Sequence, residues 1–413
     1  MGLYSLAGFL FSGNANDLLH FVGGKAYISW VAGALMVVAF LGCGTALRGL
    51  KTKIGTAWLG FVVCLIMATP FSIWRGESTD LLTSYIPRTL FIFFYVTAFT
   101  VTLRNCRFLV TVYIVCIDAL LVCCALYGQS DEAGRFHIPD SLFFGGANEL
   151  ALALVCALAF ALYLLLQKSK FGQILGAAQF LLTLFYMVKT GSRGGFLALM
   201  AFLLVWFLFS SQRLKLVALA IPAVVIVVAL SGSIVKRLVE IAVPGNIDAS
   251  NASGEAQESQ VERTMLLRKS IMFALHNPLF GTGPGTFRDA LWNEDVREAT
   301  HTHSLGTHNS YTQVASECGF PAFFCYITVV FGSIASNLRI LKRTRGSPSA
   351  FGVYSIALTL FTSLIAFAIA TFFDHQAYTG TLPFLSGLSA ALALASRNGD
   401  PQWIEAEAAA GNA

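Results

Sequence analysis

Three groups of polar residues stand apart in an otherwise apolar chain, and each has residue types suited to acid–base chemistry or to binding an anion. The first is Lys189-Thr-Gly-Ser-Arg193-Gly-Gly195, which ends one apolar run and begins the next. A guanidinium can bind a phosphate through two parallel hydrogen bonds, and neighbouring glycines let the backbone approach closely. Arg193 is therefore a candidate anion ligand, although an arginine that only reaches to lipid headgroups could occupy the same position.

The second group begins at Arg263 and ends in the glycine-rich run 281–285, shortly after Pro278. Proline stops a helix, and the glycines that follow favour a tight turn. This run is not a dinucleotide-binding fingerprint, because a predicted helix rather than a strand precedes it, and no Gly-Lys-Ser/Thr completes a phosphate loop. We interpret these glycines as turn residues.

The third group contains His308, which stands just before a short predicted helix that leads into the next apolar run. Histidine accepts a proton near neutral pH, so it is suited to act as general base for an attacking hydroxyl. Asn309 or Ser310 is interpreted as the cap of this helix. The nearby His301 and His303 leave a zinc site open as an alternative, although the spacing H-x-H-x4-H matches no established ligand pattern.

Weaker candidates also lie at the ends of apolar runs, where they could line a cavity or simply cap a helix. They are Trp74-Arg75-Gly-Glu77, Asn148-Glu149 and Asp374-His375. Asp118 differs from these, because it lies in the middle of an apolar run, where a carboxylate needs a partner. A hydrogen bond to a neighbouring helix and a proton relay are both open for Asp118.

These residues must be positioned by helices that cross a membrane. Of the 413 residues, 56% are hydrophobic and only 12% are charged, whereas a soluble domain has about 25% charged residues. Runs of about 20 apolar residues can cross a bilayer as helices. We expect eleven spans, and residues 2–24 could add a twelfth. The expected spans are 28–47, 55–73, 86–103, 108–127, 149–166, 171–188, 195–211, 214–232, 319–338, 350–373 and 381–396.

Basic residues predict the orientation of these spans, because cytoplasmic loops are enriched in lysine and arginine. Five alternate loops are basic and contain no acidic residue, which makes them cytoplasmic. Their basic residues are Arg48, Lys51, Lys53, Arg104, Arg107, Lys168, Lys170, Arg213, Lys215, Arg339, Lys342, Arg343 and Arg345. The long segment 233–318 is then periplasmic. The net charge of +5 reflects this bias, and we expect no nucleic-acid partner.

The chain accordingly divides into an N-terminal transmembrane bundle (1–232), a periplasmic loop (233–318), C-terminal transmembrane helices (319–396) and a cytoplasmic tail (397–413). Within the periplasmic loop, an amphipathic helix is predicted that could lie on the membrane face. Its apolar residues are Leu266, Leu267, Ile271, Ala274 and Leu275.

Taken together, these features resemble the superfamily of O-antigen ligases and O-antigen polymerases. Three pieces carry the resemblance: Ser192-Arg193-Gly-Gly195 at the end of a span; Arg263 with Pro278 and Gly281 downstream; and His308-Asn309-x-Tyr311-x-Gln313-x-x-x-Glu317-x-Gly319. One departure is Leu267, at a position where the family often has tryptophan.

The resemblance implies an all-α polytopic membrane protein of the glycosyltransferase C kind, in the bacterial inner membrane, with a large helical periplasmic loop. It implies that Arg193 and Arg263 hold the diphosphate of an undecaprenyl-linked glycan, and that His308 orients or deprotonates an acceptor hydroxyl. Residues that could support this site are Lys189, Asn309, Tyr311, Glu317 and Arg75. The expected reaction is an inverting transfer without metal or cofactor.

The acceptor stays open at this point. Ligation to lipid A core, polymerisation of repeat units and transfer to protein serine or threonine would all use such a site. A non-enzymatic transporter of lipid-linked glycan is the alternative from another class. A transporter would be expected to place its polar groups near the middle of the membrane, where Asp118 stands alone.

Overall fold

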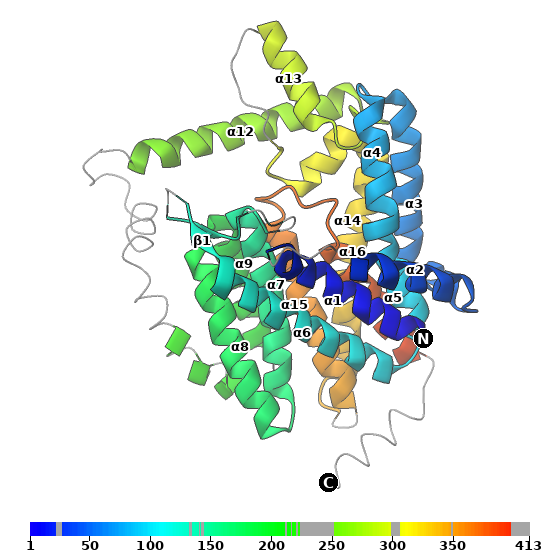
Figure 1. The fold of residues 1–413 in the computed structure, drawn as a ribbon, viewed down its shortest axis with the longest axis vertical. Coiled ribbons are helices and arrows are strands. Elements are labelled where there is room, and N and C mark those ends of the chain that lie inside the picture. Colours follow the sequence, from blue (N-terminus) through cyan, green and yellow to red (C-terminus); the bar gives the residue numbers. More distant parts are fainter. Residues whose placement is uncertain are drawn as a thin grey trace.

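The computed structural model describes residues 1–21, 27–131, 134–139, 141, 144–210, 213–215, 217–219, 222–223, 252–298, 306–347 and 350–397. Within these ranges the chain is almost entirely helical, with one short antiparallel hairpin (Figure 1). The prediction of an all-α protein is confirmed.

The elements follow in chain order. The N-terminal part contains α1 (Gly2–Phe21), α2 (Tyr27–Leu41), η1 (Ala46–Lys51), α3 (Lys53–Ala68), η2 (Thr69–Phe71), α4 (Arg75–Tyr85), the π-helical turn η3 (Ile86–Leu90), α5 (Phe91–Phe99) and α6 (Leu103–Tyr127). The hairpin β1 (Gln129–Ser130) and β2 (Phe136–His137) precedes α7 (Ala147–Leu166), α8 (Lys170–Lys189) and α9 (Arg193–Phe209). The remaining helices are α12 (Ala252–His276), α13 (Phe287–Glu298), α14 (Ser310–Thr344), α15 (Phe351–Ala370) and α16 (Thr381–Arg397).

Six described helices are long and apolar enough to cross a bilayer, in agreement with a polytopic membrane protein. They are Lys53–Phe71, Leu103–Tyr127, Ala147–Leu166, Lys170–Lys189, Ser310–Thr344 and Phe351–Ala370. Four shorter apolar helices are Gly2–Ser12, Val31–Leu41, Arg193–Phe209 and Thr381–Ser396. The predicted number of eleven or twelve spans is therefore higher than the number of full-length spanning helices in the described chain.

The difference has a structural reason, because an apolar run need not be one helix. The predicted span 86–103 contains a π-helical turn, then α5, then a non-helical step before α6 begins at Leu103. Pro87 lies in that π-helical turn, and proline removes a backbone hydrogen-bond donor. The predicted span 214–232 lies mostly outside the described residues.

Side-chain caps mark where several membrane helices begin. The hydroxyl groups of Thr52, Thr102, Ser169 and Ser192 each accept a hydrogen bond from the backbone N–H three residues further on. Such caps satisfy donors that the first helical turn leaves unpaired.

α7 and α15 form the centre of the bundle. In each of these helices, 83% of the most apolar stretch of 18 residues is buried inside the protein. α7 packs against α8 and α15, while α15 also packs against α9, α14 and α16. Small residues and hydroxyls let these helices approach closely. For example, the hydroxyl of Ser363 in α15 donates to the carbonyl of Cys156 in α7 at 3.1 Å.

Asp118 has a partner on a neighbouring helix. Nε2 of Gln179 in α8 donates a hydrogen bond to Oδ1 of Asp118 in α6 at 2.8 Å. This contact supplies the interhelical partner that a carboxylate at this depth requires.

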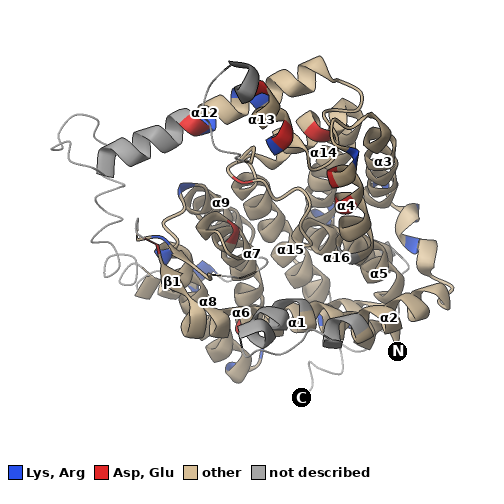
Figure 2. Ribbon diagram, turned by 45° about the horizontal axis from the view of Figure 1, so that its top comes forward, with Lys and Arg blue, Asp and Glu red and all other residues tan. Residues whose placement is uncertain are grey.

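α12 lies crosswise over one end of the bundle, and α13 lies beyond it (Figure 1). The two helices share a small core formed by Leu266, Phe273, Phe287, Ala290 and Leu291. Figure 2 shows charged residues of α4, α12 and α13 at this end of the molecule.

The predicted apolar face of α12 is divided between protein and surroundings. Leu266 and Ala274 are buried, whereas Ile271 and Leu275 are 45% and 63% exposed. The helix therefore packs on α13 and α14 with one part of that face and leaves the other part uncovered by the described chain. The predicted boundary at 318/319 falls inside α14, at the non-helical Gly319. Apart from Arg397, the predicted tail lies outside the described residues.

Candidate active site

His308 occupies a sharp turn immediately before α14. Its φ is 48°, in the left-handed region, which costs a non-glycine residue about 1 kcal/mol. Asn309 is the N-cap: its side-chain oxygen accepts hydrogen bonds from the N–H groups of Tyr311 at 2.9 Å and Thr312 at 3.1 Å. The capping role predicted for Asn309 is confirmed, and the cap fixes the turn that carries His308.

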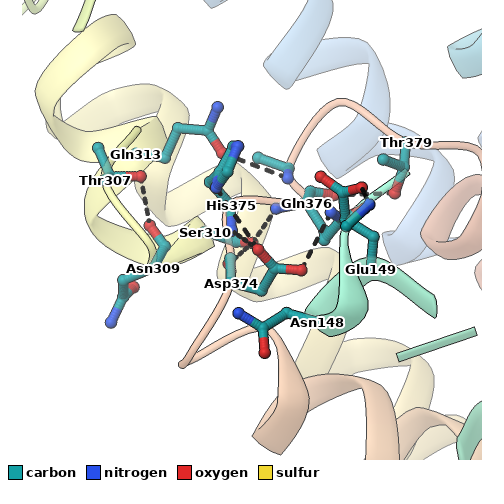
Figure 3. Close-up of polar contacts among 12 residues, drawn as sticks. Asn148, Glu149, Thr307, Asn309, Ser310, Gln313, Asp374, His375, Gln376 and Thr379 are labelled. Atoms are coloured by element: carbon teal, nitrogen blue, oxygen red, sulfur yellow. Dashed lines mark hydrogen bonds and ion pairs between the residues drawn. The ribbon is translucent and has the colours of Figure 1, made fainter. Parts of the chain in front are cut away.

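The connection between α15 and α16 brings Asp374 and His375 beside His308. The imidazole rings of His308 and His375 meet edge to face, with centroids 5.3 Å apart and planes at 82°. Nδ1 of His375 lies 3.5 Å from Oδ1 of Asp374. Ser310 holds the α15–α16 connection against the start of α14. Its hydroxyl donates a hydrogen bond to the Asp374 carbonyl and accepts one from the Gln376 N–H, both at 2.7 Å (Figure 3).

The surroundings of His308 keep its imidazole neutral. Burial is the main cause that lowers the pKa of His308, and His375, Arg263, Arg288 and Arg135 add to it, so that the pKa falls to about 4. At pH 7 the ring is therefore unprotonated and able to accept a proton. Nδ1 of His308 is buried and has no hydrogen-bond partner among the described residues.

Asp374 is the negative group of this cluster. Burial raises the pKa of its carboxyl group, hydrogen bonds and nearby guanidinium groups oppose part of that rise, and the resulting pKa is about 6. The donors are the His375 N–H at 2.9 Å and Nε2 of Gln376 at 3.1 Å. Arg263 and Arg135 supply the positive charge. Asp374 therefore remains mostly ionised at neutral pH.

Arg193 and Arg263 come from α9 and α12 and lie close enough for their charges to interact. Burial lowers the pKa of Arg263 and Arg193 lowers it further, whereas Asp374 and Glu262 raise it. Neither guanidinium has a hydrogen-bond or ion-pair partner in the part of the chain that the structure describes. Two neighbouring guanidinium groups in this state have the chemistry needed to bind an anion such as a diphosphate.

A close packing of two backbone segments accounts for Pro278, Gly281 and Gly319. The N–H of Phe320 donates to the carbonyl of Pro278 at 2.8 Å. Gly281 and Gly319 have φ values of 66° and 79°, and a Cβ at either position would overlap the backbone of the opposite segment. Only glycine combines that φ with that approach, so Gly281 is a turn residue, as predicted for the run 281–285, and Gly319 marks the kink inside α14.

Glu317 joins this turn to the rest of the site. Its carboxylate accepts hydrogen bonds from the N–H of Gly285 at 3.0 Å and from the hydroxyl of Tyr378 at 2.7 Å. The side chain is buried. Glu317 thus connects α14 to the glycine-rich turn and to the α15–α16 connection, which is a positioning task.

The other predicted supporting residues contact the surrounding framework. The hydroxyl of Tyr311 donates to the carbonyl of Ala368 in α15 at 2.9 Å. Nζ of Lys189 lies 5.5 Å from the ring centroid of Phe136 and 5.1 Å from that of Phe185. Arg75 begins α4 and is exposed, and no described contact joins it to His308.

Several residues near His308 have weak sequence signals or none. In the sequence, Asp374-His375 and Asn148-Glu149 are recognisable only as polar pairs at the ends of spans. Arg288 stands in no motif. Arg135 did carry one signal, the same that marks Arg193: it is a basic residue in the set of loops that the distribution of charges predicts to be periplasmic.

One group of three potential metal ligands exists in the described part of the chain. Ligand atoms of His308, Asp374 and His375 all lie within 4.8 Å of one another. Three protein ligands are enough for a catalytic zinc ion. However, a metal on His308 would occupy the atom needed to accept a proton, so the two roles exclude each other. His301 and His303, the alternative ligands predicted from sequence, lie outside the described residues.

The helices define a polytopic α-helical membrane protein, and arginines from several elements gather around His308 and Asp374. Residues 178–327 match the family described as O-antigen ligase. The resemblance to the O-antigen ligase and polymerase superfamily is confirmed over this segment. The matched segment includes Arg193, Arg263 and His308. No curated protein matches the chain.

Proposed function

We propose that the protein transfers a glycan from an undecaprenyl-diphosphate carrier to an acceptor hydroxyl at the periplasmic face of the bacterial inner membrane. One observation supports the proposal: a neutral imidazole, His308, stands near the guanidinium of Arg263, which in turn lies close to the guanidinium of Arg193, and neither guanidinium has an ion-pair partner in the described chain. The O-antigen ligase domain supports a lipid-linked glycan as substrate.

In the proposed reaction, Arg193 and Arg263 bind the diphosphate and His308 accepts the proton of the acceptor hydroxyl. The hydroxyl oxygen attacks the anomeric carbon from the side opposite the diphosphate, so the configuration inverts. As this bond forms, the bond from the anomeric carbon to the diphosphate oxygen breaks, and its electron pair leaves with undecaprenyl diphosphate. The two guanidinium groups stabilise the charge that develops on that oxygen.

The charges of the site are suited to this sequence of events. Without a ligand, positive neighbours hold the pKa of His308 well below its usual value. A bound diphosphate brings negative charge close to the same arginines and offsets their effect on the imidazole. The pKa of His308 then rises towards the working pH, and the ring becomes a stronger base when the donor is in place.

The acceptor we propose first is the lipid A core, as in an O-antigen ligase. Polymerases and protein O-oligosaccharyltransferases of the same superfamily would use the same site chemistry with another acceptor. A deletion strain separates these cases. Full-length glycan left on the lipid carrier indicates a ligase, a single unpolymerised repeat indicates a polymerase, and loss of glycan from protein alone indicates the third.

The direct test uses purified protein with a lipid-linked glycan and candidate acceptors, and measures formation of the new glycosidic bond. The rival from another class, a transporter, is tested with the same donor in vesicles. Movement of the lipid across the bilayer without a new glycosidic bond would overturn the enzyme proposal. Reporter fusions test the location: positions within 244–300 should report periplasm, and positions after Arg104 and Arg343 should report cytoplasm.

A further inference from the structure

Arg135 lies in the connection between α6 and α7, outside the segment that matches the family. Its backbone is fixed by the small hairpin, since its N–H donates to Oδ1 of Asp131 at 2.7 Å. The next residue, Phe136, is buried, and its ring stacks on Tyr186 with centroids 5.2 Å apart. Lys189 covers the same ring. The hairpin is thus anchored on the end of α8.

The guanidinium of Arg135 binds two separate parts of the site. Nη2 donates to Oδ1 of Asn148, in the first turn of α7, at 2.8 Å. Nε donates to the carbonyl of Thr190, just before α9, at 3.4 Å. The guanidinium therefore connects the beginnings of α7 and α9, and a lysine ammonium could not keep both hydrogen bonds in the same geometry.

Asn148 links Arg135 to the start of α9. Its Oδ1 also accepts a hydrogen bond from the hydroxyl of Ser192 at 2.9 Å. Ser192 is the N-cap of α9, and the helix begins with Arg193. Arg135, Asn148 and Ser192 thus form a continuous hydrogen-bonded path that ends at the residue proposed to hold the diphosphate.

We propose that Arg135 is a positioning residue of this site: through Asn148 it fixes the Ser192–Arg193 corner, and it adds a third guanidinium beside the diphosphate-binding pair. The inference rests on the proposed function. It goes beyond that function, because neither the sequence motifs nor the matched domain include Arg135.

Electrostatics supports the geometry. The charged and titratable groups that act on His308 come from every element around it: Arg135 before α7, Arg263 of α12, Arg288 of α13, and Asp374 and His375 of the α15–α16 connection. Arg135 lowers the pKa of His308 and opposes the rise in the pKa of Asp374. Removal of its charge should therefore raise the pKa of His308.

The experiment compares Arg135→Gln and Arg135→Lys with wild type and with Arg339→Gln, an exposed arginine near the far end of α14. Binding is measured with undecaprenyl diphosphate, and transfer is measured across pH. Arg135→Gln should weaken binding by about tenfold, because it removes a nearby positive charge and the hydrogen bonds that fix the Ser192–Arg193 corner. It should also move the acid limb of kcat/KM to higher pH. Arg135→Lys should keep the wild-type acid limb but lose turnover severalfold, while Arg339→Gln should match wild type.

Each outcome decides the inference. Arg135→Gln with wild-type binding and an unchanged pH profile would overturn it and leave the proposed function standing. If that variant does not fold, Arg135→Lys decides, because wild-type turnover there would contradict the positioning role. A wild-type protein that fails to bind undecaprenyl diphosphate would overturn the proposed function, and this inference with it.

Discussion

The imidazole rings of His308 and His375 meet edge to face, with centroids 5.3 Å apart, although one residue precedes α14 and the other follows α15. Two imidazolium ions at this separation would repel each other strongly, so at most one of the two rings is positively charged near neutral pH. Burial lowers the pKa of both residues. The arrangement therefore keeps His308 ready to accept a proton, as a general base must be.

A pH profile should show this directly. Because the pKa of His308 is lowered to about 4, kcat/KM should stay level as pH falls through the usual histidine range and decline only near that value. The acid limb of kcat, which reports the complex with donor, should lie at higher pH, because the diphosphate favours the protonated ring. A kcat/KM limb at about 6.5, the ordinary histidine value, would contradict this description. Thermal unfolding at each pH controls for loss of structure.

Arg193→Lys tests the geometry of anion binding, since it keeps the charge and loses the planar fork. The expected result is a rise in KM for the donor. Arg263→Ala should lower kcat/KM by about tenfold to hundredfold, because a hydrogen bond to a charged group contributes about 1.5–3 kcal/mol.

The matched control for both arginines is Arg339→Gln, which removes an exposed guanidinium far along α14 from His308. Steady-state kinetics on folded, purified variants provides the measurement. Unaltered transfer by Arg193→Ala would remove Arg193 from the proposed site.

Chelators distinguish a proton-accepting His308 from a metal ligand. The ligand atoms of His308, Asp374 and His375 lie within 4.8 Å of one another, so a zinc ion there is a definite alternative. We expect full transfer activity after dialysis against a strong chelator. Activity that disappears and returns with added zinc would assign these three residues to a metal centre instead.

Gly281→Ala should destabilise the fold more than Gly346→Ala does. Both glycines have positive φ, 66° and 81°, so alanine is strained by about 1 kcal/mol at each. At Gly281 the new Cβ would also overlap the backbone of Glu317, whereas at Gly346 nothing lies within 4 Å. Thermal unfolding in detergent measures the difference. Equal shifts would mean that the close packing between the turn and α14 contributes little.

The sequence was sufficient to predict helices, apolar spans and the turn at 281–285, because hydropathy and glycine or proline positions are local signals. Six described helices reach spanning length, and other predicted spans are shorter helices or lie outside the described residues. An apolar run such as 86–103 reads as continuous, yet the π-helical turn at Pro87 and the step before Leu103 divide it. Such breaks depend on backbone hydrogen bonds, which composition does not record.

The candidate site could be predicted only in part for a related reason. Arg193, Arg263 and His308 stand in recognisable motifs, although their roles remain a proposal. The packing of distant segments brings the ring of His375 against His308 and brings Arg135 close enough for its charge to act on that imidazole. Nothing in the residues around Arg135 indicates that its fork would span Asn148 and Thr190. Long-range partners of this kind need the fold itself.

His308→Ala provides the most direct test of the central claim, that this imidazole accepts the proton of the acceptor hydroxyl. The measurement is single-turnover transfer from a lipid-linked glycan by folded, purified protein, with undecaprenyl diphosphate binding determined on the same sample. We predict that the variant binds undecaprenyl diphosphate as wild type does, because the base acts on the acceptor, and that its transfer rate falls by at least about a hundredfold. Transfer at the wild-type rate in His308→Ala would contradict the account.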